Sequence, residues 1–231
     1  MMEFLFLDLD DTILDFRQAE HTAITRTLSA FGIDPTEEIT EAYRRINLRC
    51  WKELERGTLT REDLKRVRFE KLFQQFEVEA DVQAVSDTYM EFLGQGHWFL
   101  PGAEEAVERL SKKYRLFLAS NGTASVQHGR MTSAGLYPYF EEVFVSQKIG
   151  HNKPSIEYFN ACFAQVRDFD KSRCIMVGDS LSSDILGGIN AGIATCWVAP
   201  MDKDPGAIRP DYRIESIAQL EGLLDTIKKE G

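Results

Sequence analysis

Short apolar runs alternate with longer amphipathic segments over the C-terminal half of this chain. The runs at 115–120, 143–146, 173–178 and 194–199 have the length of buried strands, and helical spacing of apolar residues dominates between them. A parallel sheet whose two faces are covered by crossover helices produces this alternation. Helices are predicted at 124–134, 155–165, 181–190 and 217–229, and an edge strand at 211–214. The pattern therefore predicts an α/β fold built on a parallel sheet.

The segment 16–96 has a different pattern. It contains no buried-strand run, and its apolar residues recur at helical spacing, as at Leu64 and Leu72. Glycine and proline predict breaks between helices at 32–35 and 57–60. We therefore expect this segment to be entirely helical.

An apolar run at 4–7 precedes the helical segment and fits the later sheet as its first strand. The predicted fold class is α/β, a Rossmann-like doubly wound parallel sheet with an all-helical cap domain inserted after the first strand. The predicted domains are a core formed by 1–15 and 97–231 and a cap formed by 16–96.

Charge and composition narrow the choice of partners and compartment. The chain has 231 residues, with 27 Lys and Arg against 37 Asp and Glu, and its net charge of −10 argues against a nucleic-acid partner. No apolar run approaches the ~20 residues of a membrane span, and Asp8 interrupts the only apolar run near the N-terminus. The four cysteines are scattered, which is typical of free thiols in a reducing compartment. We expect a cytoplasmic protein with no membrane partner; the oligomeric state is not predicted.

Acidic residues follow two of the predicted strands. Asp8 and Asp10 end the first run in FLFLDLDDTIL, and Asp179 and Asp184 follow the run at 173–178 in IMVGDSLSSD. The carboxyl ends of parallel strands meet at one edge of the sheet, where ligands bind in folds of this kind. Buried carboxylates are unfavourable without a partner, and a hard cation between the two pairs would supply one. The acids therefore point to a divalent cation and to phosphate chemistry.

Other polar residues are expected at the same edge. Ser120 and Asn121 follow the strand at 115–120, and Lys153 lies in HNKP just before a helix. Taken singly, such residues are also common as turn residues, helix caps or solvated lysines. Together, the runs ending in DLDDT, in Ser120 and in GDSLSSD, with a Lys-Pro between the last two, resemble the haloacid dehalogenase superfamily. The resemblance implies the core fold of that superfamily.

The same resemblance implies hydrolysis of phosphate monoesters through an aspartyl-phosphate. Asp8 would be the nucleophile, and Asp10 the general acid for the leaving alcohol and then the base for water. A two-residue offset places these two side chains on the same side of an extended chain. Lys153 is the third predicted catalytic residue. Ser120, the Asn121 amide and Lys153 would hold the transferring phosphoryl group, and Thr12 would support the loop and bind phosphate peripherally.

A magnesium ion is the implied cofactor, with Mn²⁺ as a substitute. Mg²⁺ prefers a few carboxylates together with water. The family pattern implies ligation by Asp8, by the backbone carbonyl of Asp10 and by Asp179. Asp184 would contact the ion either directly or through a water molecule.

The second acid distinguishes branches of the superfamily. Asp10 favours phosphatases over true dehalogenases, which lack an acid at that position, whereas sugar-phosphate mutases share the pair and stay possible. The segments 47–73 and 183–200 are similar to those of bacterial pyrimidine 5′-nucleotidases, which hydrolyse UMP, dUMP and dTMP. We therefore favour a pyrimidine nucleoside 5′-monophosphate nucleotidase. The alternatives are a generalist small-metabolite or sugar-phosphate phosphatase, and a non-catalytic metabolite-binding protein on the same fold.

The cap must recognise the leaving group if this function holds. Asn47, Trp51, Arg68 and Phe69 fit a base-stacking and hydrogen-bonding wall, but Trp51 and Phe69 fit packing inside the helical bundle as well. We expect the cap to close over the substrate and to open for product release, with hinges near 15–16 and 96–101.

Overall fold

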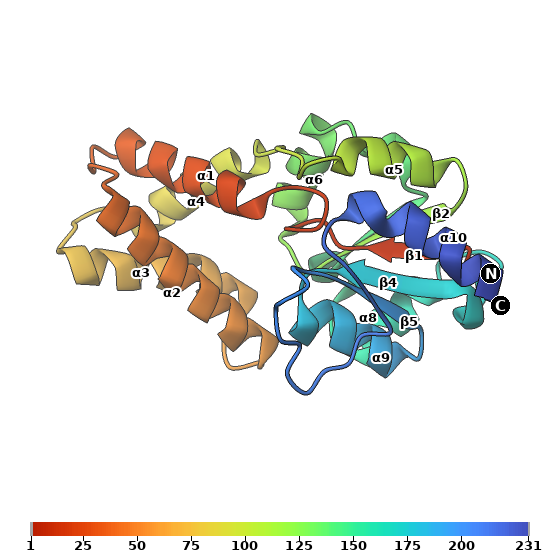
Figure 1. Cartoon of the computed structure of the whole chain (residues 1–231). Coiled ribbons are helices and arrows are strands. Elements are labelled where there is room, and N and C mark those ends of the chain that lie inside the picture. Colours follow the sequence, from red (N-terminus) through yellow and green to blue (C-terminus); the bar gives the residue numbers. More distant parts are fainter. Residues whose placement is uncertain (1, 231) are drawn as a thin grey trace.

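The computed structural model describes residues 2–230, and a six-stranded parallel sheet forms its centre (Figure 1). The strands are β1 (Phe4–Leu7), β2 (Arg115–Ser120), β3 (Glu142–Val145), β4 (Cys174–Gly178), β5 (Ala194–Val198) and β6 (Tyr212–Ile214). Their spatial order is β3-β2-β1-β4-β5-β6, which is the order of a doubly wound Rossmann sheet. The predicted α/β class is confirmed, and the first strand lies in the middle of the sheet.

The register of the central strands sets the position of the site. Leu7 at the end of β1 lies opposite Leu118 on β2 and Val177 on β4. All the strands are parallel, so the chain leaves β1, β2 and β4 at the same edge of the sheet. In Figure 1 this edge faces the helical cap, and both termini lie at the opposite end of the molecule.

Two hydrophobic layers cover the sheet because side chains alternate along each strand. Leu5 and Leu7 pack in one layer with α5 and α10, and Phe4 and Phe6 pack in the other with α8. The core helices are α5 (Ala103–Ser111), α6 (Ala124–Ser133), α7 (Ser146–Ile149), α8 (Ile156–Phe163), α9 (Leu186–Ala191) and α10 (Leu220–Glu230). No helix within residues 2–230 is both long enough and apolar enough to cross a membrane.

Some predicted boundaries were wrong by a residue or by a turn. The strand predicted at 143–146 ends at Val145, and the helix predicted at 181–190 begins with a π-helical turn over Leu181–Ile185. That wide turn brings the Asp184 carboxylate back to accept the N–H of Ser180 at 3.0 Å. The π-helical turn therefore places the Asp184 carboxylate beside the end of β4.

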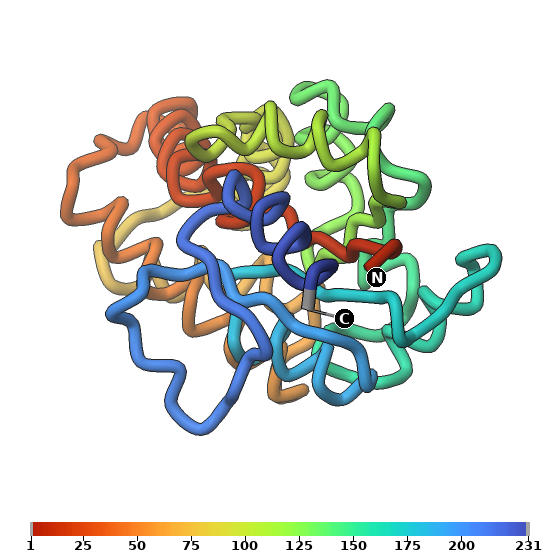
Figure 2. Tube along the Cα trace, turned by 45° about the vertical axis from the view of Figure 1, so that its right-hand side comes forward, coloured from red at the N-terminus to blue at the C-terminus, as the bar shows by residue number. Residues whose placement is uncertain are grey.

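The cap consists of α1 (Phe16–Ala30), α2 (Glu37–Glu55), α3 (Arg61–Phe76) and α4 (Val82–Gly94), which lie together at one end of the molecule in Figure 1 and are seen from another side in Figure 2. Their buried apolar residues form a hydrophobic cluster, which Val126 of α6 also joins. Tyr43, Phe69 and Tyr89 meet there with ring centroids 5.2–5.6 Å apart. Phe69 is fully buried, so packing inside the bundle is its role. The exact domain boundaries at 15–16 and 96–97 stay predictions.

Candidate active site

A cavity of about 330 Å³ lies between the carboxyl ends of the strands and the cap. It brings together most of the predicted site residues. The core contributes Asp8, Asp10, Ser120, Asn121, Lys153 and Asp179, and the cap contributes Glu20, Asn47, Trp51 and Arg68. Residues more than a hundred positions apart therefore meet in one place, as the strand pattern predicted.

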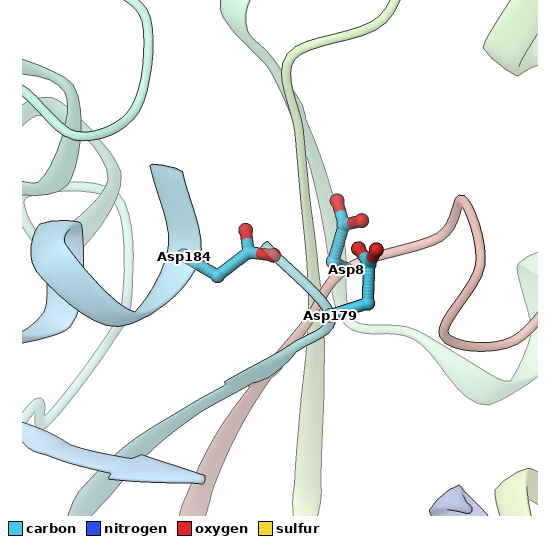
Figure 3. Close-up of side chains that lie close together, drawn as sticks. All are labelled: Asp8, Asp179 and Asp184. Atoms are coloured by element: carbon cyan, nitrogen blue, oxygen red, sulfur yellow. The ribbon is translucent and has the colours of Figure 1, made fainter. Parts of the chain in front are cut away.

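Three carboxylates converge at the core end of this cavity. Asp8, Asp179 and Asp184 each offer one oxygen, and these oxygens lie within 4.8 Å of one another. Figure 3 shows Asp8 and Asp179 side by side at the strand ends, with Asp184 pointing towards them. A Cβ atom on Gly178 would stand 2.2 Å from Oδ2 of Asp184, so glycine at the end of β4 permits this approach. An all-oxygen donor set with this spacing fits a hard divalent cation such as Mg²⁺.

Lys153 lies buried among the carboxylates. Its Nζ donates hydrogen bonds to Asp8 Oδ1 at 2.8 Å, to Asp184 Oδ1 at 2.6 Å and to the carbonyl of Ala119. Although burial opposes it, the acids Asp184 and Asp8 raise the pKa of Lys153 above its ordinary value. The lysine is therefore charged, and it places one positive charge against three carboxyl groups.

This imbalance governs the protonation of the acids. Burial, with additional repulsion from Asp184 and Asp10, raises the pKa of Asp8 to about 8 even though Lys153 opposes the shift. Burial and the neighbouring Asp184 and Asp8 raise the pKa of Asp179 well above its ordinary value. A second, divalent positive charge would let all of these groups ionise together.

Asp10 is held by two residues that the sequence did not single out. Gln127 Nε2 donates to Asp10 Oδ2 at 2.7 Å and to Ser120 Oγ at 2.8 Å. Arg130, fully buried, forms an ion pair with Asp10 Oδ1. Both lie on α6, three residues apart, so they share one helix face. The sequence places both residues on the predicted helix that follows the strand at 115–120, but their burial and their contact with Asp10 appear only in the structure.

Of the three predicted phosphate-binding residues, Ser120 and Asn121 line the cavity and Thr12 does not. Ser120 Oγ accepts the N–H of Gly122 at 3.0 Å, and the Asn121 side chain exchanges two hydrogen bonds, of 2.8 and 2.9 Å, with the backbone of Lys153. These bonds tie the loop after β2 to the loop that carries the lysine. Thr12 is fully buried, lies away from the cavity lining, and its hydroxyl has no hydrogen-bond partner among residues 2–230. The structure therefore does not bring Thr12 to the proposed phosphate site.

One cap side chain reaches across to the core. Arg61 donates to Ser146 Oγ at 2.8 Å and to Asn152 Oδ1 at 3.0 Å. It also donates to the carbonyl of Gly122 at 3.1 Å, and its guanidinium lies 5.7 Å from the ring centroid of Trp51. The first residue of α3 thus joins the cap to both loops of the phosphate side.

Comparison with known proteins assigns the chain to a family. The chain matches the family model of the haloacid dehalogenase-like hydrolases over residues 2–192. The HAD-hydrolase YfnB of Bacillus subtilis is 35% identical over 96% of this chain and 94% of YfnB. The pyrimidine 5′-nucleotidases PynA of Streptococcus pneumoniae and YjjG of Escherichia coli are 35% and 30% identical, over 96% of this chain and over 95% and 97% of their own lengths. The chain belongs to the haloacid dehalogenase-like hydrolase family, as its motifs predicted.

A solved structure supports the same assignment. A crystal structure of YfnB from Bacillus subtilis, bound to magnesium and revealing interdomain movement, superposes with a TM-score of 0.92 at 35% identity and covers 97% of this chain and 99% of YfnB. The likeness therefore extends over the sheet and the helical cap together. The predicted enzyme class, phosphoric monoester hydrolase, is confirmed by the family and its nucleotidase members.

Proposed function

We propose that this chain is a Mg²⁺-dependent 5′-nucleotidase that hydrolyses the pyrimidine nucleoside 5′-monophosphates UMP, dUMP and dTMP through an aspartyl-phosphate. The observation that carries the proposal is the convergence of Asp8, Asp179 and Asp184 with Lys153 at the end of a cavity that the cap covers. Two relatives that match nearly the whole chain, PynA and YjjG, are pyrimidine 5′-nucleotidases, which supports the choice of substrate.

The carboxylate ligands of the metal are assigned from their positions, and the backbone carbonyl of Asp10 is assigned from the family pattern. Asp8, Asp179 and the backbone carbonyl of Asp10 would hold Mg²⁺, and the ion would balance charge on the phosphoryl oxygens when bound. Asp184 already binds Lys153 through Oδ1 and the Ser180 N–H through Oδ2. We therefore assign Asp184 a contact through a water molecule. The magnesium in the YfnB crystal structure supports the choice of cation.

The chemistry uses the two acids at the end of β1. An oxygen of Asp8 attacks phosphorus, the bond from phosphorus to the ester oxygen O5′ breaks, and Asp10 gives its proton to O5′. Water then attacks the aspartyl-phosphate, Asp10 takes a proton from the water, and the Asp8 carboxylate is regenerated as orthophosphate leaves. Lys153, the Ser120 hydroxyl and the Asn121 amide stabilise the negative charge of the transferring group.

The cap would exclude water during this reaction and would move between turnovers. The hydrophobic cluster of the cap is built from its own four helices together with Val126 of α6, so a rigid-body rotation would keep the packing among the cap helices and would change their contact with Val126. The interdomain movement described for YfnB supports such a rotation. We assign the hinges to 15–16 and 96–101.

Release of inorganic phosphate from a substrate panel tests the proposal. The panel contains UMP, dUMP, dTMP, AMP, a hexose phosphate and phosphoglycolate, each with Mg²⁺ and with chelator. We expect preference for the pyrimidine nucleotides, no activity with chelator, and none in the variant Asp8→Asn. Activity that persists in Asp8→Asn rules out the mechanism, and preference for the hexose phosphate rules out the substrate. Nucleotide binding without phosphate release would support the non-catalytic alternative.

A further inference from the structure

The cap end of the cavity contains a polar array that the reaction at phosphorus does not use. Glu20 on α1, Asn47 on α2 and Arg68 on α3 all line the cavity, and all three are buried, with exposed fractions of 6%, 1% and 2%. Asn47 Nδ2 donates to Glu20 Oε1 at 2.6 Å, and Arg68 Nη1 donates to Asn47 Oδ1 at 3.2 Å. Three different helices thus contribute one side chain each to a single hydrogen-bonded chain.

This array retains unused hydrogen-bonding capacity. Arg68 Nε is buried and finds no acceptor in the described part of the chain, and Nη2 contacts Met90 Sδ at 3.2 Å, which is a weak acceptor. The Glu20 carboxylate can accept about four hydrogen bonds, and Asn47 supplies one. Buried groups left this way destabilise a fold, and a ligand that pairs with them relieves the penalty.

The surroundings of the array suit a flat ring. Phe16, Leu64, Leu93 and Val126 contribute apolar surface to the same cavity, and Trp51 lies on its wall. Apolar walls with a few fixed polar groups at one end are the usual form of a site for a heterocycle. The ring edge that meets the array must offer a carbonyl oxygen to the donors and an N–H to the carboxylate.

We propose that Glu20, Asn47 and Arg68 form the base-reading site, in which Arg68 and Asn47 donate to a ring carbonyl of uracil or thymine while Glu20 accepts the N3–H. The inference rests on the proposed nucleotidase function and assigns its specificity to particular residues. Uracil and thymine present an N–H beside a carbonyl, whereas N3 of cytosine is an acceptor. Burial, which outweighs the Asn47 hydrogen bond and the Arg68 charge, raises the pKa of Glu20 to about 7, and pairing with a ring N–H favours the carboxylate form.

A substrate whose N3 hydrogen is replaced by a methyl group tests the assignment without altering the protein. kcat/KM is measured for UMP, for N3-methyl-UMP, which has no N3–H, and for p-nitrophenyl phosphate, which has no base. For the wild type we expect N3-methylation to lower kcat/KM by about 10- to 100-fold, since a buried acceptor is left unpaired. Equal rates on UMP and N3-methyl-UMP would overturn the assignment.

A matched pair of variants locates the effect. In Glu20→Gln we expect kcat/KM for UMP to fall by about 10-fold or more, mainly through KM. We expect discrimination against N3-methyl-UMP to shrink, and p-nitrophenyl phosphate hydrolysis to stay within about twofold. Glu91→Gln, an exposed cap residue outside the cavity lining, serves as the control. Discrimination that survives unchanged in Glu20→Gln would overturn the role of Glu20. Failure of the wild type to release phosphate from UMP would instead overturn the proposed function itself.

Discussion

Arg130 joins the proposed general acid, Asp10, to the linker of the cap. The fully buried guanidinium forms an ion pair with Asp10, and its Nε donates to the carbonyl of Gly96 at 2.8 Å. Gly96 lies two residues after the end of α4, and a Cβ on it would stand 2.6 Å from the Cβ of Ala19 on α1. One arginine therefore ties the orientation of the acid to a linker packed closely against the cap.

Arg130→Met should impair proton transfer to the leaving group more than the attack on phosphorus. A general acid contributes roughly 10²- to 10⁴-fold when the leaving group needs a proton. We expect kcat/KM on UMP to fall about 10- to 100-fold, and kcat/KM on p-nitrophenyl phosphate to fall much less, because p-nitrophenolate leaves without a proton. The parameter kcat/KM is compared because kcat also includes the hydrolysis of the aspartyl-phosphate, for which Asp10 is the base with both substrates. Steady-state kinetics on both substrates measure the difference.

Asp10→Asn provides the control for this positioning role. Arg130→Met added to Asp10→Asn should cost little further activity on UMP, because both changes affect one interaction. Equal losses of kcat/KM on UMP and on p-nitrophenyl phosphate in Arg130→Met would contradict the role.

Mg²⁺ should stabilise the fold through the three converging carboxylates. A ligand at 100 times its Kd adds about 2.7 kcal/mol, which corresponds to a rise in Tm of about 5–10 °C for a chain of this size. Asp179→Asn should abolish most of the rise, and Glu91→Gln should retain it. Thermal unfolding with and without Mg²⁺ measures this independently of activity. A full rise in Asp179→Asn would remove that residue from the ligand set.

The sheet could be predicted because each strand leaves a local signature. The runs at 115–120 and 4–7 correspond to β2 and β1, and the register of β1 brings the acids that follow it to the edge predicted for them. The helical cap could be predicted equally well, because its apolar residues recur at helical spacing and the predicted break at 57–60 falls between the end of α2 and the start of α3.

The partners of the site residues could not be predicted in the same way. Gln127 binds Asp10 across 117 positions of sequence, and no local pattern encodes such a pair. Thr12 lies in the motif after β1, yet its side chain is buried away from the cavity, because a motif fixes the backbone path more firmly than side-chain direction. Trp51 and Phe69 belong to the same helical pattern, and only the packing separates the cavity wall from the bundle core.

Arg61→Ala should weaken substrate binding by loosening the closed cap. Arg61 carries three hydrogen bonds from α3 to the loops of the core. We expect KM for UMP to rise about 10-fold, which corresponds to about 1.4 kcal/mol. The Tm should change little, because the two hydrophobic cores are untouched. Steady-state kinetics measure KM, thermal unfolding measures Tm, and small-angle scattering measures the rise in radius of gyration that we expect if the cap opens.

Arg66→Ala is the matched control for Arg61. Arg66 lies on the same helix, but it pairs with Glu70 and Asp63 on the surface of the cap. Its loss should leave KM unchanged. An unchanged KM and radius of gyration in Arg61→Ala would show that this arginine does not hold the cap closed.

Glu20→Gln should stabilise the protein at neutral pH while it weakens base recognition. Burial raises the pKa of Glu20 from 4.5 to about 7, against the opposing effects of Asn47, Arg68 and Arg44 and with a small addition from Asp11. The unfolded chain releases this proton near pH 4.5, so the stability present below that pH is lost as the pH rises to about 7. Glutamine does not titrate. The difference in free energy of unfolding between the variant and the wild type should therefore be more favourable to the variant at pH 8 than at pH 4, by up to about 3 kcal/mol. Urea unfolding of both proteins at the two pH values measures the gain. If the difference in free energy of unfolding between the two proteins is the same at pH 4 and at pH 8, Glu20 ionises without penalty in the folded cap.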